Sequence, residues 1–189
     1  VLAELKLRGI DKAHVAGHSM GGAVAVLMAL DDPGAIASLT LVAPGGFGPE
    51  MDGKALQSLT EATTADELSS AYAAMMAPRT APDLAMIERL LDLYFRPGQR
   101  EALRQILARI SRGQGQGELP LGALVKGRFP VKLIWGAEDV IVPFTQAANA
   151  PDWFSRVNLP GKGHMLIDEA PDAVAHAILA NLQQPPQTI

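Results

Sequence analysis

AHVAGHSMGGAVAVLMAL, residues 13–30, carries the pattern Gly-x-Ser-x-Gly with Ser19 at its centre. A serine on a tight strand-to-helix turn projects its hydroxyl from the edge of a parallel sheet. The glycines two residues before and after it leave room for the flanking strand and helix. We therefore predict a strand over 13–16, a tight turn over 17–22, a buried helix over 23–30 and Ser19 as a nucleophile.

The backbone N–H of Met20 is predicted to form half of an oxyanion hole. The helix that begins after Ser19 directs its amides toward developing negative charge, which makes this N–H a suitable donor. A pentapeptide of this kind can also be a plain glycine-rich turn. The apolar strand before it and the helix of small residues after it favour the nucleophile turn.

The rest of the chain alternates short apolar strands with helices. The first residues, 1–8, read as the end of a helix, and further strands are expected over 38–43, 131–136 and 155–159. A last helix is expected over 171–182, where a proline stands at its start. This alternation predicts an α/β fold with a parallel sheet and right-handed crossovers.

Residues 46–128 differ in texture from the rest, because strand signals disappear and helical signals take over. Thr64 and Glu67 match a capping box at the start of one helix. The segment is predicted to hold three helices and then a flexible glycine-rich break, over residues 64–76, 82–94, 98–112 and 113–117. We interpret it as a helical insertion that divides one domain into core residues 1–45, the insertion 46–128, and core residues 129–189.

Asp139 and His164 are the predicted partners of Ser19, because Ser, Asp and His follow in the chain order that accompanies this type of turn. Asp139 stands just after the strand at 131–136, and a carboxylate at the carboxyl end of a parallel strand faces the site crevice. His164 follows the last strand in the glycine-rich turn PGKGH. His164 would take the proton of Ser19 as a general base, and Asp139 would orient the imidazole.

Plainer interpretations exist for each of these side chains. Asp139 could merely cap its loop, with Glu138 as its nearest rival, and His164 could be an ordinary loop histidine. The other histidines and acidic residues near the motifs are expected to be structural: His14 at a strand end, His18 packed beside or lining the site, His176 on the last helix, and Asp168 and Glu169 at the N-terminal cap of that helix.

Length, net charge and cysteine content exclude several classes of function. The chain has 189 residues, of which 48% are hydrophobic, and this suits one globular domain with a core. A net charge of −4 gives no electrostatic reason to expect nucleic acid or an anionic membrane as a partner. The absence of cysteine excludes disulfides, thiolate metal sites and a cysteine nucleophile, and it is compatible with the cytoplasm. No ligand-spaced cluster of His, Asp and Glu is present, so neither a metal nor a cofactor is predicted.

The motifs HVAGHSMGGA, SLTLVAPGG, LIWGAEDVIVP and LPGKGHMLIDEAP together resemble the α/β-hydrolase superfamily. LVAPGGFGPE and the helical segment after it resemble the hydrolase domain attached to some dihydrolipoyl acetyltransferases of acetoin dehydrogenase complexes. The resemblance implies a helical cap over the site, an acyl-serine intermediate and no cofactor. Only the last four strands of the family sheet are found. The His-Gly loop that supplies the second oxyanion donor in the family is absent. We therefore expect a truncated chain whose strand before Ser19 lies on an open edge.

Three functions follow as hypotheses. The first is a serine hydrolase that acts on an ester, thioester or similar carbonyl of a small apolar substrate, with Tyr72, Tyr94 and Phe95 of the insertion adding surface to the pocket. The second is an acyltransferase-associated domain, for which a homo-oligomer or a multi-enzyme complex is the expected assembly. The third is a non-catalytic remnant that lacks half of the oxyanion hole.

Overall fold

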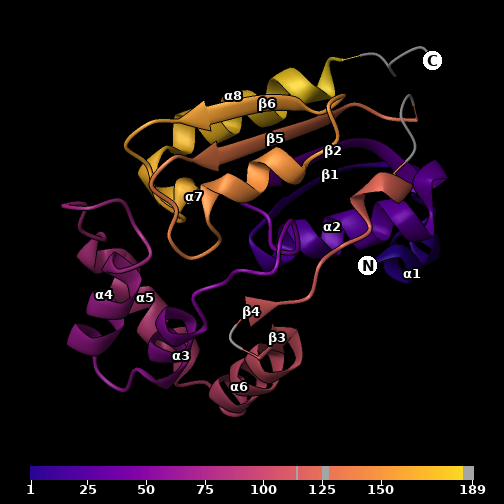
Figure 1. Ribbon diagram of the computed structural model, residues 1–189. Helices are drawn as coiled ribbons and strands as arrows, with labels where there is room; N and C mark the ends of the chain where they lie inside the picture. The colour runs from indigo at the N-terminus through magenta and orange to yellow at the C-terminus, as the bar shows by residue number, and fades with distance from the viewer. Residues whose placement is uncertain (114, 125–127, 185–189) are drawn as a thin grey trace.

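The computed structural model describes residues 1–113, 115–124 and 128–184. Strands and helices alternate along these residues, with four consecutive helices between the second and third strands of the main sheet (Figure 1). The elements follow in this order: α1 (Leu2–Leu7), β1 (Ala13–His18), α2 (Met20–Asp31), η1 (Pro33–Ala35), β2 (Ile36–Val42), α3 (Gly53–Glu61), α4 (Ala65–Ala73), α5 (Leu84–Tyr94), α6 (Gln99–Ile110), β3 (Ser111–Arg112), β4 (Gly115–Gln116), η2 (Leu121–Ala123), β5 (Val131–Gly136), η3 (Phe144–Asn149), β6 (Ser155–Leu159), α7 (Leu166–Glu169) and α8 (Pro171–Leu182).

The described residues form a four-stranded parallel sheet in the order β1-β2-β5-β6. The register places His18 beside Val42, and Val42 beside Ile134. The carboxyl ends of neighbouring strands are therefore level, and the loops that leave them meet at one edge. The predicted α/β class with a parallel sheet is confirmed, and β1 lies at the edge of the sheet.

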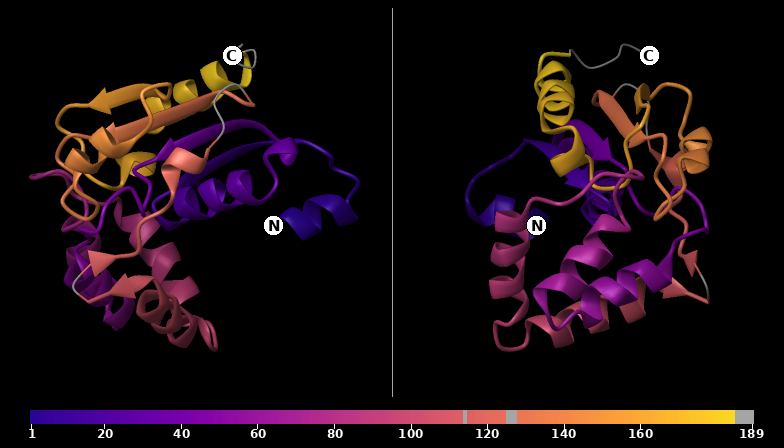
Figure 2. Two further views of the ribbon diagram at one scale, coloured as in Figure 1. Left: turned by 45° about the vertical axis from the view of Figure 1, so that its right-hand side comes forward. Right: turned by 90° about the vertical axis from the view of Figure 1, so that its left-hand side faces the viewer.

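Helices α2 and α8 cover opposite faces of this sheet (Figure 2). The core between them is centred on β2 and β5, whose side chains are almost all buried. Asn181 of α8 is fully buried, and its amide donates to the Leu39 carbonyl at 3.0 Å and to the Thr40 hydroxyl at 2.9 Å, which anchors the helix on β2. None of the described helices is both long and apolar enough to cross a membrane.

Beneath the carboxyl edge of the sheet lies the helical insertion, by which we mean α3 to α6 together with β3 and β4 (Figure 1). Its helices have a small hydrophobic cluster of their own, apart from the main core. That cluster consists of Ala62, Leu68, Tyr72, Met76 and Ile87. By contrast, no residue of α6 is buried, and its Leu103, Leu107 and Ile110 are only half-buried.

The strands end close to where the sequence predicts them, and the helices differ more. The strand before Ser19 runs to His18 rather than residue 16, and α2 starts directly at Met20. This helix is not buried all round, because Val24 is 40% and Leu27 is 50% exposed. The prediction of a buried helix over 23–30 is therefore wrong on one side, because a sequence without a polar face does not require that every side of the helix be covered.

Inside the insertion, helix α3 was not predicted. Asp52 caps it, since its carboxylate accepts hydrogen bonds from the amides of Lys54 and Ala55, both at 3.0 Å. The capping box at Thr64 is half formed: its hydroxyl accepts from the Glu67 amide at 3.2 Å, but the Glu67 carboxylate accepts from the preceding residue, Thr63. The three predicted helices are present, and each falls two or three residues short of the prediction at one end.

The predicted flexible break at 113–117 falls partly outside the described residues, because Gln114 is not among them. On either side of it, Ser111 pairs with Gln116 and Arg112 with Gly115 as a short antiparallel ladder. The Gln116 side chain then joins the insertion to the loop after β2, accepting from the Gly46 amide at 3.0 Å and donating to the Gly48 carbonyl at 3.1 Å. Gln116 therefore holds the end of this segment against the loop after β2.

Candidate active site

Ser19 stands alone between β1 and α2, at φ 53° and ψ −120°. A residue other than glycine rarely adopts a positive φ, and the strain persists only where the surroundings fix it. Here the Ser19 amide donates to the Val42 carbonyl at 2.9 Å, and its carbonyl accepts from Gly22 at 2.9 Å and Gly45 at 3.0 Å. The neighbouring strand and the loop after it thus hold the turn in its strained shape.

The glycines around Ser19 differ in how strictly they are needed. A Cβ on Gly17 would lie 2.2 Å from the Gly21 carbonyl oxygen, and a Cβ on Gly22 would lie 2.7 Å from the Pro44 side chain. A Cβ on Gly21 would meet nothing within 4 Å among the described residues. The predicted steric need for glycine holds for Gly17, while on the helix side the crowded position is Gly22 rather than Gly21.

The buried His164 ring lies between Asp139 and Ser19. Its Nδ1 is 2.8 Å from the Asp139 carboxylate and its Nε2 is 2.9 Å from the Ser19 hydroxyl, and its own exposed fraction is 0%. An ionised carboxylate only accepts hydrogen bonds, so Nδ1 carries the proton and Nε2 is free to accept from the serine. Residues from three distant parts of the chain therefore form one hydrogen-bonded row.

The Asp139 carboxylate has a partner on every side. One oxygen accepts from the amides of Ile141 and Val142 at 2.9 and 3.0 Å, and the other accepts from the Trp135 indole N–H at 3.0 Å as well as from His164. Buried carboxylates need such compensation, since losing water without a partner is costly. Trp135 was not singled out in the sequence, although an indole four residues before the acid, on the strand that carries it, is a usable signal.

His18 packs against the same ring from the strand side. Its Nε2 donates to the His164 carbonyl at 2.8 Å, and the two ring centroids are 4.9 Å apart. Burial, with the nearby His164 adding to it, lowers the pKa of His18 from 6.5 to about 4. His18 is therefore neutral at ordinary pH, and it contacts the site as the sequence predicted.

Asp168 and Glu169 do not cap the last helix as predicted. The Glu169 carboxylate accepts from the amides of Gly163 at 3.0 Å and Ala77 at 3.0 Å, and Asp168 accepts from the Tyr72 hydroxyl. Burial, followed by the hydrogen bond to Asp168, raises the pKa of Tyr72 well above its ordinary value. The two acids thus fasten the insertion to the loop that carries His164, and the sequence pattern gave no sign of this long-range role.

The remaining candidates lie away from Ser19. The ring of His14 is hydrogen bonded to the Ser38 hydroxyl at 2.8 Å, and His176 is exposed on α8. Glu138 is exposed as well, while the neighbouring Asp139 is buried. In the described part of the chain, no group of three or more His, Asp or Glu side chains is placed to hold a metal ion.

A cavity of about 360 Å³ opens at Ser19 and Met20, between the carboxyl edge of the sheet and the insertion. Its walls are mainly aliphatic, with charged residues of the α6 end and the following loop also present. The apolar lining includes Met51, Leu56, Leu59, Leu103, Ile106, Leu107, Ile110, Leu119, Ile141 and Val142. Of the three predicted aromatic residues, Tyr94 lines the cavity, whereas Tyr72 is bonded to Asp168 and Phe95 is 57% exposed elsewhere.

Relatives of known name share the sequence and the fold. The chain is 36% identical over 184 residues to the dihydrolipoyllysine-residue acetyltransferase component of the acetoin cleaving system of Pseudomonas putida, covering 97% of this chain and 49% of that protein. The corresponding protein of Cupriavidus necator is 32% identical over 157 residues, covering 83% and 42%. The chain thus spans about half the length of these relatives.

Solved structures agree in fold. The 2-hydroxy-6-oxo-6-phenylhexa-2,4-dienoate hydrolase of Rhodococcus sp. strain RHA1 superposes with a TM-score of 0.77 at 19% identity, covering 95% of this chain and 67% of that one. The family model described as the alpha/beta hydrolase family matches residues 1–177. With the parallel sheet and the turn at Ser19, this match shows that the chain belongs to the α/β-hydrolase family.

Proposed function

We propose that the chain is a serine hydrolase in which Ser19 attacks an ester, thioester or similar carbonyl, His164 is the base and Asp139 orients the base. The observation that carries the proposal is the position of the His164 ring. Its Nδ1 is hydrogen bonded to Asp139 at 2.8 Å and its Nε2 to Ser19 at 2.9 Å. A weakly nucleophilic hydroxyl needs such a base within hydrogen-bond reach, and the base needs a third group to hold it.

The reaction then follows in two halves. His164 Nε2 takes the proton of Ser19, whose Oγ forms a bond to the carbonyl carbon, and the resulting oxyanion is stabilised by the Met20 N–H in the first turn of α2. The protonated Nε2 gives its proton to the leaving group as the bond to that group breaks, which leaves an acyl-serine. Water, deprotonated by the same Nε2, then releases the acid and restores Ser19.

The cavity supports a small, mostly apolar acyl group as substrate. Its walls are mainly aliphatic, which suits an apolar group. Its volume of about 360 Å³ lies at the lower end of the range for small-molecule sites. The 2-hydroxy-6-oxo-dienoate hydrolases among the relatives act on carbonyl substrates, as their names state. Hydrolysis of a carbon–carbon bond next to a carbonyl is therefore a variant of the same proposal.

Covalent labelling tests the proposal directly. A fluorophosphonate probe is expected to label the wild type on Ser19, and Ser19→Ala is expected to abolish the label. His164→Ala is expected to slow labelling by orders of magnitude, because the hydroxyl loses its base. Ser58→Ala, which changes an exposed serine of α3, serves as the matched control and should label like the wild type. Equal labelling of all four proteins would refute the assignment.

A second candidate is acyl transfer within an acetoin-cleaving complex, supported by the 36% identity to the acetyltransferase component. In that case a thiol, rather than water, would accept the acyl group from Ser19. Adding dihydrolipoamide to a turnover assay separates the two: transfer predicts acyl-dihydrolipoamide as the main product, and hydrolysis predicts free acid at an unchanged rate.

A further inference from the structure

The Ser19 cavity is bounded on one side by the seam between α3 and α6. Met51, Thr60 and Leu107 line this cavity and also line a second, larger hollow of about 1010 Å³ on the outer side of the seam. Ser19 does not line the larger hollow. These three shared wall residues make the two spaces neighbours.

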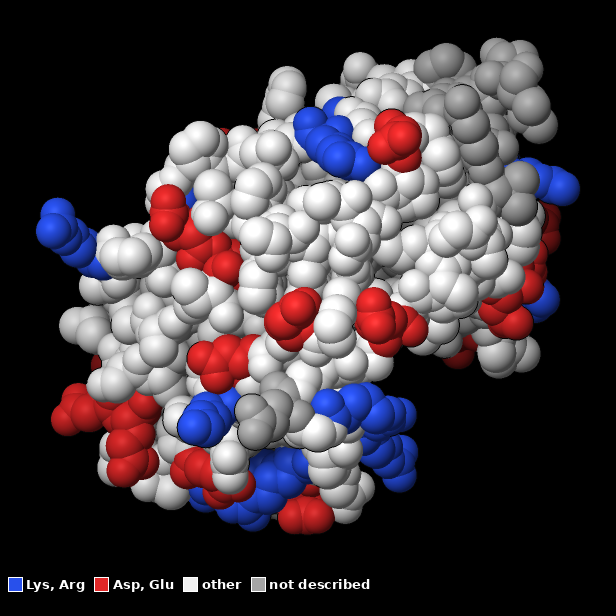
Figure 3. Space-filling view, in the orientation of Figure 1, with Lys and Arg blue, Asp and Glu red and all other residues white. Residues whose placement is uncertain are grey.

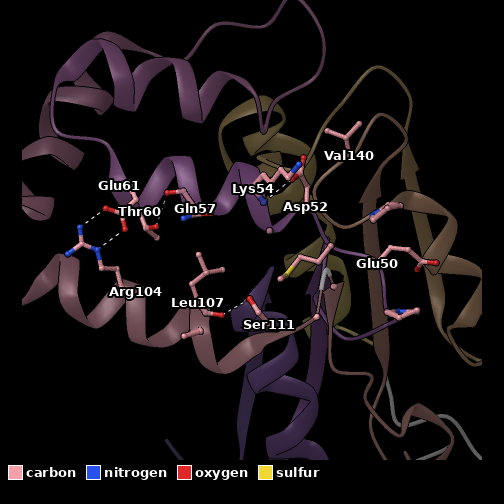
Figure 4. A pocket seen from close by; sticks show the side chains of 17 residues that line it. Glu50, Asp52, Lys54, Gln57, Thr60, Glu61, Arg104, Leu107, Ser111 and Val140 are labelled. Carbon is pink, nitrogen blue, oxygen red and sulfur yellow. Dashed lines mark hydrogen bonds and ion pairs between the residues drawn. The ribbon is translucent and has the colours of Figure 1, made fainter.

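The outer hollow, which we call the α3–α6 groove, is lined by residues 49–54, 57, 60, 61, 104, 107, 108, 111, 113, 115, 140 and 143. Figure 4 shows Thr60 and Leu107 facing the gap between the two helices, with Gln57 and Ser111 nearby. The groove thus runs from the protein surface to the residues that also bound the Ser19 cavity.

Helix α6 is suited to form a wall rather than to fill a core. It has no buried residue, and its Leu103, Ile106 and Ile110 line the inner cavity. What bridges it to α3 is Glu61, whose carboxylate accepts from the Arg104 Nε at 2.7 Å and whose carbonyl accepts from Arg100 at 2.9 Å. These hydrogen bonds join the two helices at Glu61. One turn further along α6, Leu107 lines both the inner cavity and the outer hollow.

The groove is lined by charges of both signs as well as by neutral polar groups, because Glu50 and Lys54 also belong to its walls. Its Glu61 is paired with Arg104, and its Asp52 carboxylate is engaged by the amides that begin α3. The hydroxyl of Ser111 donates to the Leu107 carbonyl at 2.7 Å, so its oxygen keeps acceptor capacity toward the groove. Because Glu50 and Lys54 are of opposite sign, the groove shows no clear excess of one charge, and its neutral polar side chains Gln57, Thr60 and Ser111 are suited to hydrogen bonds with amide or hydroxyl groups.

We propose that the α3–α6 groove is a binding site for the elongated, neutral, amide-bearing arm of a substrate whose carbonyl sits at Ser19 and whose acyl group fills the inner cavity. The inference rests on the proposed function. Binding energy from the arm, remote from the reacting carbon, would then raise turnover of the whole substrate over that of a truncated one.

Two acetyl thioesters test the groove, one of ethanethiol and one of pantetheine, a flexible arm with two amides. Released thiol can be followed with a thiol reagent without background, because the protein has no cysteine. The wild type is expected to prefer the pantetheine thioester by about tenfold or more in kcat/KM. Ala108→Trp, which fills the groove, should reduce this preference to about one while leaving the ethyl thioester unchanged.

Ala102→Trp is the matched control, since Ala102 is an exposed residue of the same helix that lines neither space. It should keep both rates. Gln57→Trp fills the groove from the opposite wall and gives a second test if Ala108→Trp loses its far-UV helical signal. Equal wild-type rates on the two thioesters, or a preference that survives both groove variants, would overturn the inference alone. Absence of Ser19-dependent turnover of either thioester would overturn the proposed function as well.

Discussion

His18 is a histidine that the fold keeps neutral, and this makes stability depend on pH. Its pKa is about 4 in the folded protein, against 6.5 for an ordinary histidine. Between those values the unfolded chain takes up a proton that the folded chain does not, so the free energy of unfolding is complete above pH 6.5 and falls as the pH drops toward 4. The contribution is at most about 3 kcal/mol.

His18→Gln keeps a side-chain N–H for the His164 carbonyl and removes the titration. We expect its free energy of unfolding, measured by urea titration at pH 7, 5.5 and 4.5, to change less over this range than that of the wild type. Between pH 7 and 4.5 the wild type should lose about 2 kcal/mol more of its free energy of unfolding than the variant. Parallel pH profiles for both proteins would show that His18 is not held neutral.

Asp139 and Glu138 are adjacent carboxylates in opposite environments, which gives a matched pair of variants. Asp139→Asn would place an amide N–H₂ against the Trp135 indole and the His164 Nδ1, both of which now donate to the carboxylate. The imidazole would lose its orientation, and kcat should fall by about 10³- to 10⁴-fold. Glu138→Gln should stay near the wild-type rate because Glu138 is exposed. Similar losses in the two variants, in an ester hydrolysis assay, would contradict the role of Asp139.

The local geometry around Ser19 was predictable because its motif is local. Ser19 and its strained turn follow from the spacing of Gly17 and the serine, and the side chains of Asp139 and His164 do lie beside it. Contacts between distant segments left no such trace. The indole of Trp135 meets the acid only because the turn after β5 folds back over its own strand.

Secondary structure was most predictable in the sheet. β5 and β6 are short apolar or alternating runs with turn residues at both ends, so their limits at Val131–Gly136 and Ser155–Leu159 agree with the expectation. Helix α3 is short, but Leu56 and Leu59 lie on one side of it, and this spacing and the cap at Asp52 were the overlooked signals. Helix ends were less predictable, since the last turn depends on tertiary contacts.

The loop that carries His164 is stabilised by α7 and by the segment that follows α4. Glu169 of α7 accepts from the amides of Gly163 and Ala77, and the His164 amide donates to the Met75 carbonyl at 2.9 Å. Glu169→Ala would leave two buried amides without an acceptor and should lower the free energy of unfolding by about 3 kcal/mol.

The same change should lower kcat more than it raises KM, because Glu169 is expected to position His164 rather than to touch substrate. Asp168→Asn, next to it, keeps an oxygen for the Tyr72 hydroxyl and should cost less than 1 kcal/mol. Denaturant unfolding and steady-state kinetics measure both variants. Equal effects of the two substitutions would show that the fastening does not depend on Glu169.

At the scale of the whole molecule, acidic and basic side chains are mixed on the surface, and the four-stranded sheet has an unpaired edge at β1. Figure 3 shows acidic and basic side chains interspersed over the lower part, where the helical insertion lies, with larger uncharged areas over the sheet. β1 is paired only with β2 in the four-stranded sheet. Helix α2, packed beside it, exposes Val24 and Leu27 on neighbouring turns of one face. An unpaired strand edge beside exposed apolar side chains favours association of the chain with itself.

We therefore expect this protein to associate in a concentration-dependent manner, and Val24→Lys/Leu27→Lys to suppress it. The control is Leu179→Lys/Leu182→Lys on α8, which adds the same charge at leucines that are 59% and 38% exposed. Sedimentation velocity over a concentration series should give a sedimentation coefficient that rises for the wild type and the control and stays constant for the α2 variant. Suppression by both double variants would point to net charge as the cause. A wild type with a constant sedimentation coefficient would show that the edge of β1 and the exposed face of α2 do not bring chains together.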